Sequence, residues 1–110
     1  MATDKSLTID CATEGDVLRV TPRGEIDLST SPSLRRSLQA ALAEGTLPVE
    51  IVLSEVPYMD SSGVATLVEA LQTCRRQQRT LTLVSPSHRV ASIFKISKLD
   101  TVFTIRDSDA

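Results

Sequence analysis

The stretch Met59-Asp60-Ser61-Ser62-Gly63 decides the fold, because it joins a run typical of a buried strand to a run typical of an amphipathic helix. The run before it, Pro-Val-Glu-Ile-Val-Leu at 48–53, is short and rich in β-branched residues, as buried strands are. We therefore predict a strand at 49–53 and a helix at 62–78. In that helix, apolar residues recur every three or four positions, which is the spacing of one helix face: Val64, Leu67, Val68, Leu71 and Cys74.

Toward the N-terminus, the sequence predicts a β-hairpin. Strand-like runs at 7–11 and 17–20 are separated by Glu14-Gly15-Asp16, which is typical of a hairpin loop that contains glycine. The segment Gly24-Glu25-Ile26-Asp27 continues extended. The chain should therefore begin with an antiparallel pair of strands.

A first helix is predicted after this hairpin. It begins at Thr30 or Ser31, next to Pro32, because proline is tolerated in the first turn of a helix. Gly45 is placed to end it. Its buried face should carry Leu34, Leu38, Ala41 and Leu42.

The C-terminal half continues the alternation of strands and helices. We predict a strand at 80–84, a helix that opens at Ser85-Pro86-Ser87 and a last strand at 101–105. Val90, Ile93, Phe94 and Leu99 should face inward from that helix region. Strands that alternate with helices favour parallel crossovers, so the fold class is α/β with a mixed sheet.

Length and composition favour one soluble domain over residues 1–110. A chain of 110 residues can bury roughly two thirds of its unfolded surface, with a core at about 6–106 and a frayed polar tail at 107–110. Acidic and basic residues are mixed along the chain and the net charge is -2, which argues against nucleic-acid binding. No apolar run approaches the length that membrane insertion requires.

The cysteines and the arginine cluster are given structural interpretations. Cys11 and Cys74 show no metal-ligand spacing and are expected to be reduced core thiols, which suits a cytoplasmic protein. Arg75, Arg76 and Arg79 lie near the end of the second helix, where cations complement the helix dipole. We expect no metal and no cofactor.

The serines at the strand–helix junction allow two interpretations. The first N–H groups of a helix lack intrahelical partners and the helix dipole is positive there, so the position favours an anion such as a phosphate on one serine. Alternatively, Ser61 or Ser62 is only an N-cap. Asp60 is a candidate cap as well, and Asp27 a turn residue with an Asx-type bond.

The neighbours of the serines are also ambiguous. Gly63 either allows a partner to approach closely or is merely tolerated in the first helical turn. Tyr58 and Met59 either offer exposed apolar contacts or pack inside. His88, the only histidine, has no catalytic motif around it, so a serine hydrolase centred on Ser62 is a minor alternative and we expect no catalysis.

Two motifs carry a resemblance to a known family. Gly24-Glu25-Ile26-Asp27 before the first helix and Asp60-Ser61-Ser62-Gly63 before the second resemble the STAS family, and most closely its anti-sigma factor antagonists. The resemblance covers nearly the whole chain and implies a STAS-type mixed sheet with helices packed on it. It also implies that Ser62 is the phosphoacceptor, with Ser61 as second choice and cap, and that Asp27 lies beside it.

The resemblance further implies a partner switch. The unphosphorylated antagonist binds an anti-sigma factor that is also a GHKL-type serine kinase, phosphorylation ends the binding, and a PP2C-type phosphatase restores it. The alternative is a STAS subunit of an ABC-type lipid or organic-solvent transport system, which docks on the permease or ATPase. Transporter subunits often lack a hydroxyl at the second serine of the motif, so Ser62 favours the switch.

Overall fold

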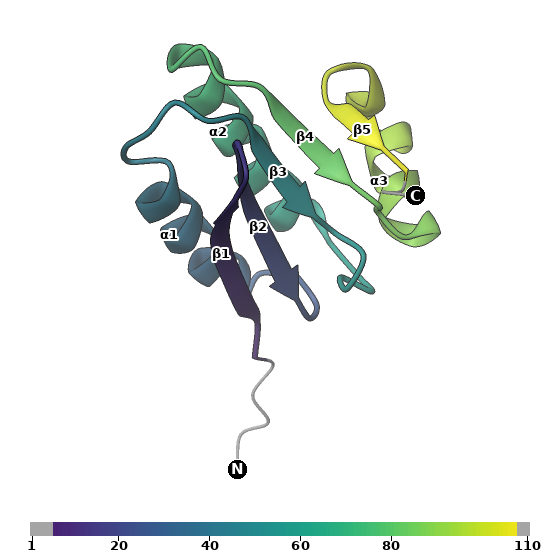
Figure 1. The fold of residues 1–110 in the computed structure, drawn as a ribbon. Coiled ribbons are helices and arrows are strands. Elements are labelled where there is room, and N and C mark those ends of the chain that lie inside the picture. The colour runs from purple at the N-terminus through teal and green to yellow at the C-terminus, as the bar shows by residue number, and fades with distance from the viewer. Residues whose placement is uncertain (1–5, 108–110) are drawn as a thin grey trace.

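Within the part of the chain that the structure describes, five strands form one sheet in the order β1-β2-β3-β4-β5, and three α-helices connect the strands from β2 onward (Figure 1). The computed structural model describes residues 6–107. The strands are β1 Thr8–Glu14, β2 Val17–Arg23, β3 Val49–Val52, β4 Leu81–Val84 and β5 Thr104–Arg106. The helices are α1 Ser31–Ala41, α2 Ser61–Arg76 and α3 His88–Ile96, followed by a short 3-10 helix, Leu99–Thr101.

The sheet is mixed, as predicted. Strands β1 and β2 pair antiparallel around the tight turn Gly15-Asp16, and Gly15 adopts a φ of +61° there, which glycine tolerates without strain. The other neighbouring strands pair parallel. Each crossover steps to the next strand in the same direction, and right-handed crossovers then place all three helices on one face, as Figure 1 shows.

Alternation along the central strands separates a buried face from an open one. On β3, Val49 and Ile51 are buried toward the helices, whereas Glu50 points to the open face. On that open face Glu50 forms ion pairs with Arg19 of β2 and Arg106 of β5. The sheet therefore presents a polar side opposite the helices, while the core lies between sheet and helices.

The end of helix α1 and the start of strand β5 differ from the predictions. Helix α1 ends at Ala41, where the N–H of Leu42 donates to the carbonyl of Leu38 at 2.9 Å and the N–H of Ala43 donates to the carbonyl of Ala40 at 3.4 Å. Gly45 therefore lies in the following loop, with a φ of +102°. The last strand begins at Thr104 rather than 101, because the preceding residues form the 3-10 helix.

Aromatic packing explains this late start of β5. Phe103 is buried and its ring meets that of Phe94 edge-on, with centroids 5.3 Å apart. Arg106 belongs to β5, and residues 108–110 of the predicted tail lie outside the described residues.

The two cysteines have different environments. Cys74 is a buried thiol on α2, as predicted, and desolvation raises its pKa. The prediction of a core thiol is wrong for Cys11, which is exposed because β1 is the edge strand of the sheet. Among residues 6–107, no helix has the length and apolar character needed to cross a membrane.

Arg79 has a structural role that the helix-dipole interpretation missed. Its side chain is buried, and Nε donates to the carbonyl of Leu47 at 2.8 Å. Nη1 donates to the carbonyl of Glu44 at 3.4 Å and to Oε1 of Gln77 at 3.0 Å. Arg79 thus fastens the loop between α1 and β3 to the end of α2, whereas Arg75 and Arg76 are exposed.

We expect Arg79→Met to lower the free energy of unfolding by about 2–3 kcal/mol, because it leaves buried carbonyl groups without their charged donor. Urea denaturation monitored by circular dichroism measures the loss. Arg75→Met is the matched control at the same helix end, and its effect should stay within about 0.5 kcal/mol. Equal losses for both variants would contradict the fastening role.

Candidate functional site

Two extended segments beyond β2 and β3 bring the starts of α1 and α2 together. Ile26 and Met59 form a parallel bridge. The N–H of Ile26 donates to the carbonyl of Tyr58 at 3.0 Å, and the N–H of Asp60 donates to the carbonyl of Ile26 at 3.1 Å. Asp27 and Asp60 therefore follow directly on paired residues, at the carboxyl edge of parallel strands, where α/β sheets commonly bind their ligands.

Asp60 caps helix α2. It has an extended backbone, and its Oδ1 accepts hydrogen bonds from the N–H of Ser62 at 2.9 Å and of Gly63 at 3.4 Å. The same oxygen accepts the Ser62 hydroxyl at 2.6 Å. The prediction that Ser61 is the cap is wrong, because the helix begins at Ser61 itself and the residue before it supplies the capping oxygen.

Asp27 makes a turn of the same form before α1. Its Oδ1 accepts the N–H of Ser29 at 2.9 Å, the Ser29 hydroxyl at 2.7 Å and the N–H of Thr30 at 3.2 Å. This is the predicted Asx-type turn. Before α1 and at the start of α2, an aspartate thus holds the hydroxyl of the serine two residues later, and the Ile26–Met59 bridge brings these two turns together.

Ser29 and Ser62 differ in exposure and in the hydrogen bonds behind them. Ser29 is exposed, whereas Ser62 is half-buried. Behind Ser62, the buried Thr66 donates its hydroxyl to the Ser62 carbonyl at 2.9 Å. Sequence reasoning missed Thr66, although its place one helical turn after Ser62 is the signal that could have found it.

The electrostatics of the site centre on Asp60. Desolvation raises the pKa of Asp60, but the hydrogen bonds from the Ser62 hydroxyl and from the N–H groups of Ser62 and Gly63 outweigh it, so its pKa lies below the usual range. The charge of Asp27 opposes this lowering. Asp27 thus acts electrostatically on the Asp60 carboxyl, and the two carboxylates give this corner of the molecule a negative character.

The N–H groups at the start of α2, which the sequence suggested could bind an anion, already donate hydrogen bonds to Asp60. Those of Ser62 and Gly63 donate to the Asp60 side chain, and that of Val64 donates to the Asp60 carbonyl. A phosphate on Ser62 would compete with Asp60 for these donors. It would also remove the hydroxyl proton that Asp60 now accepts.

Gly63 is required by packing. A Cβ at this position would lie 2.6 Å from Cγ of Met59 and 2.7 Å from Cγ2 of Ile26. The absence of a side chain lets α2 start against the Ile26–Met59 bridge. The exposed-contact interpretation is wrong for Met59, which is fully buried, whereas Tyr58 is 37% exposed.

His88 is not joined to the serines by a hydrogen bond. The Ser62 hydroxyl donates to Asp60, and among the described residues the His88 imidazole makes no hydrogen bond or ion pair. A hydrolase centred on Ser62 therefore finds no support in the geometry.

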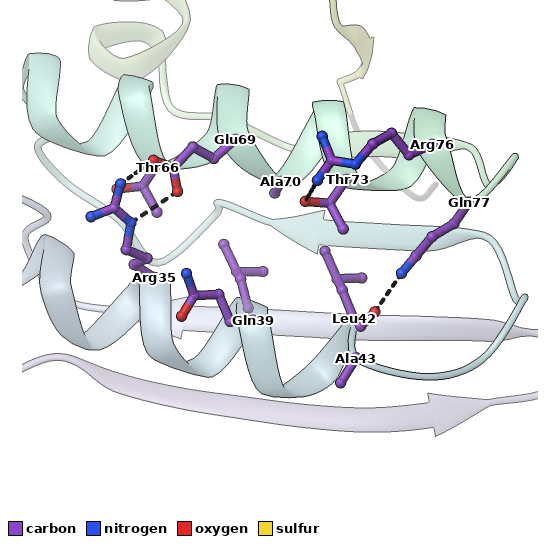
Figure 2. Close-up of a pocket in the computed structure, with 11 residues that line it drawn as sticks. Arg35, Gln39, Leu42, Ala43, Thr66, Glu69, Ala70, Thr73, Arg76 and Gln77 are labelled. Carbon is purple, nitrogen blue, oxygen red and sulfur yellow. Dashed lines mark hydrogen bonds and ion pairs between the residues drawn. The ribbon is translucent and has the colours of Figure 1, made fainter.

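A groove of about 360 Å³ lies between α1 and α2 (Figure 2). Leu38, Leu42 and Ala70 are among its apolar lining residues. The ion pair Arg35–Glu69 spans it toward the helix starts, and Gln77 donates to the Leu42 carbonyl at the other end. Ser62 and Asp60 are not among its lining residues, but Thr66, which donates to the Ser62 carbonyl, is one of them, so the groove begins about one helical turn after the candidate site.

Comparison with known proteins identifies the family. The model of the STAS domain matches residues 8–110, and the chain belongs to this family. It is 30% identical over 102 residues to the anti-sigma-B factor antagonist of Staphylococcus epidermidis, covering 93% of this chain and 94% of that protein.

Solved structures agree on the fold. An anti-sigma factor antagonist from Mycobacterium paratuberculosis superposes with a TM-score of 0.86 at 23% identity, covering 98% of this chain and 92% of that one. The Bacillus protein SpoIIAA in its phosphorylated form gives a TM-score of 0.69 at 18% identity, covering 89% and 90%. At these identities the structures establish the fold alone.

We expect Gly63→Ala to lower the free energy of unfolding by about 1–3 kcal/mol, because the added methyl overpacks the Ile26–Met59 bridge. Thermal or urea denaturation measures the loss. A double-mutant cycle with Met59→Ala supplies the control, since shortening Met59 should relieve part of the clash. Additive effects in that cycle would contradict the packing explanation.

The lowered pKa of Asp60 gives a pH-dependent prediction. A carboxyl whose folded pKa is depressed stabilises the fold above its unfolded pKa, and this contribution is lost as the pH falls through the folded value. Ser62→Ala removes a donor and should raise the pKa of Asp60, so that this contribution shrinks. Carbon-13 NMR titration of the Asp60 carboxyl measures the shift, and Ser29→Ala is the matched control that should leave it unchanged. An unmoved Asp60 titration in Ser62→Ala would refute the assignment.

Proposed function

We propose that this protein is an anti-sigma factor antagonist that binds an anti-sigma factor while Ser62 is unphosphorylated and releases it once Ser62 carries a phosphate. The observation that carries the proposal is the Ser62 hydroxyl itself. It lies at the start of α2 and is hydrogen-bonded to Asp60, whose carboxyl also interacts with the charge of Asp27, in a chain whose curated relatives are anti-sigma-B factor antagonists. The protein acts as a non-catalytic binding module.

Phosphorylation would change the charge of this corner sharply. A phosphoserine adds roughly -1.5 to -2 charge at neutral pH. Asp60 would lose the hydrogen bond from the Ser62 hydroxyl and would face a phosphate dianion instead, with the Asp27 carboxylate nearby. A partner surface shaped around the neutral hydroxyl would then meet a bulkier and more strongly hydrated group, and docking would weaken.

The host fold can accommodate this modification. Ser62 is half-buried at the edge of the sheet, so a phosphate can extend into solvent, and the positive end of the α2 dipole favours it. SpoIIAA has been solved in both unphosphorylated and phosphorylated forms. This supports a switch that changes surface chemistry rather than fold.

The proposal implies particular partners. The anti-sigma factor would itself be a GHKL-type serine kinase that modifies Ser62, and a PP2C-type phosphatase would remove the phosphate. Both act in the cytoplasm, where we place this protein. The kinase would transfer the γ-phosphoryl group of its bound ATP to the Ser62 hydroxyl and release ADP, and the phosphatase would release the group with water as inorganic phosphate. This chain itself would bind neither a cofactor nor a nucleic acid.

We expect Ser62→Ala to bind the anti-sigma factor constitutively and Ser62→Asp to bind at least about a hundredfold more weakly, which corresponds to about 3 kcal/mol. Affinity capture from the native cell lysate, with mass spectrometry of the co-purifying proteins and of the Ser62 peptide, measures both. Ser29→Ala is the matched control, because Ser29 makes the same bond to Asp27 as Ser62 makes to Asp60. It should behave like the parent.

Two outcomes would overturn the proposal. One is equal binding by folded Ser62→Ala and Ser62→Asp, which would remove Ser62 from the switch. The other is capture of an ABC permease and ATPase with unmodified Ser62, which would move the protein to a transport system and leave Ser62 as a hydrogen-bond donor to the capping Asp60.

A further inference from the structure

Leu28 is an exposed leucine in the turn that carries Asp27. It lies between Asp27 and Ser29, in the turn that begins α1, and 78% of its surface is exposed. The Asp27 end of this turn is the end that approaches Asp60. An exposed leucine gains free energy when a partner covers it, because its apolar surface leaves water.

The turn holds the Leu28 backbone firmly. On one side, the N–H of Asp27 donates to Oγ1 of the buried Thr30 at 2.9 Å, and that hydroxyl donates to the Glu25 carbonyl at 2.8 Å. On the other side, the N–H of Ser29 donates to the Asp27 side chain. A partner that covers Leu28 therefore loses little affinity to ordering of the turn.

The serine hydroxyls near Leu28 need no hydrogen-bond acceptor from a partner. The hydroxyls of Ser29 and Ser62 already donate to Asp27 and Asp60, so a partner can cover them without leaving a donor unpaired. The two carboxylates, together with the exposed Glu25, make the rim of this surface acidic. The complementary surface is an apolar cavity with a basic rim.

We propose that Leu28 is the apolar anchor with which the unphosphorylated protein docks into a cavity on the anti-sigma factor. This inference rests on the proposed function, and it names the contact that makes the neutral state bind. Leu28 follows Asp27, whose charge acts on Asp60, and Asp60 holds the Ser62 hydroxyl. A hydrated phosphate on Ser62 would therefore add charge and water to the surface that a partner must desolvate to bury Leu28. Loss of docking then needs no movement of the protein.

Ile96 is the natural comparison for Leu28. It is 82% exposed, so it offers as much apolar surface, but it lies at the end of α3, whose start follows β4 rather than β2 or β3. Single exposed apolar residues are common on protein surfaces and need no partner. Only an anchor at the switch site predicts that the two residues differ in their effect on binding.

The test uses the Ser62→Ala protein, which stays in the binding form. The anti-sigma factor that it captures is purified and titrated calorimetrically with Ser62→Ala, with Ser62→Ala/Leu28→Ala and with Ser62→Ala/Ile96→Ala. We expect Leu28→Ala to weaken binding about tenfold or more, which is about 1.4 kcal/mol, and Ile96→Ala to leave it within about twofold. Both side chains are exposed, so melting temperatures should remain those of the parent.

The outcomes separate the anchor from the switch. Binding unaffected by Leu28→Ala, with Ser62→Asp still weakened, would overturn the anchor and leave the proposed function standing. Equal weakening by Leu28→Ala and Ile96→Ala would also overturn the anchor, because the effect would not belong to this site. Failure of Ser62→Ala to capture any anti-sigma factor would overturn the proposed function and the anchor with it.

Discussion

The parallel bridge between Ile26 and Met59 is the constraint on which the site depends. Both side chains are fully buried, and α2 starts directly against them because Gly63 has no side chain. The bridge extends the pairing of β2 and β3 beyond the strands proper. In doing so it places the first turns of two helices next to each other, so that residues distant in sequence form one surface.

That surface repeats one local device twice. An aspartate accepts the backbone N–H and the hydroxyl of the serine two residues later, once before α1 and once at the start of α2. The device satisfies helix N–H groups and also holds two carboxylates close enough to interact. An uncharged Ser62 is therefore built into a hydrogen-bonded corner, and a charged group there would have to displace part of it. The same bonds that stabilise the helix start make the site sensitive to a change of charge.

Much of the fold could be predicted because its signals are local. The β-branched run at 49–53 and the helical spacing after Ser62 are properties of short segments, and they correctly predicted β3 and α2. The glycine-containing hairpin and the order of strands and helices correctly predicted the mixed sheet. Misses occurred where the decisive contact comes from elsewhere in the chain. From its place near the helix end, Arg79 was predicted to compensate the helix dipole. In the structure it instead donates to the carbonyls of Glu44 and Leu47 in a loop distant in sequence. Cys11 is apolar by type, but its strand lies at the sheet edge.

The sequence by itself determined the order of strands and helices, the family resemblance, and the pair of serines at a helix start, since each follows from residue types at short spacing. Only the tertiary structure decided which groups act together there. It assigned the cap to Asp60 rather than Ser61, buried Met59, left Leu28 exposed and brought Asp27 to Asp60. The physical reason is that burial and electrostatic coupling depend on how distant segments pack, and here that packing is set by the bridge between Ile26 and Met59.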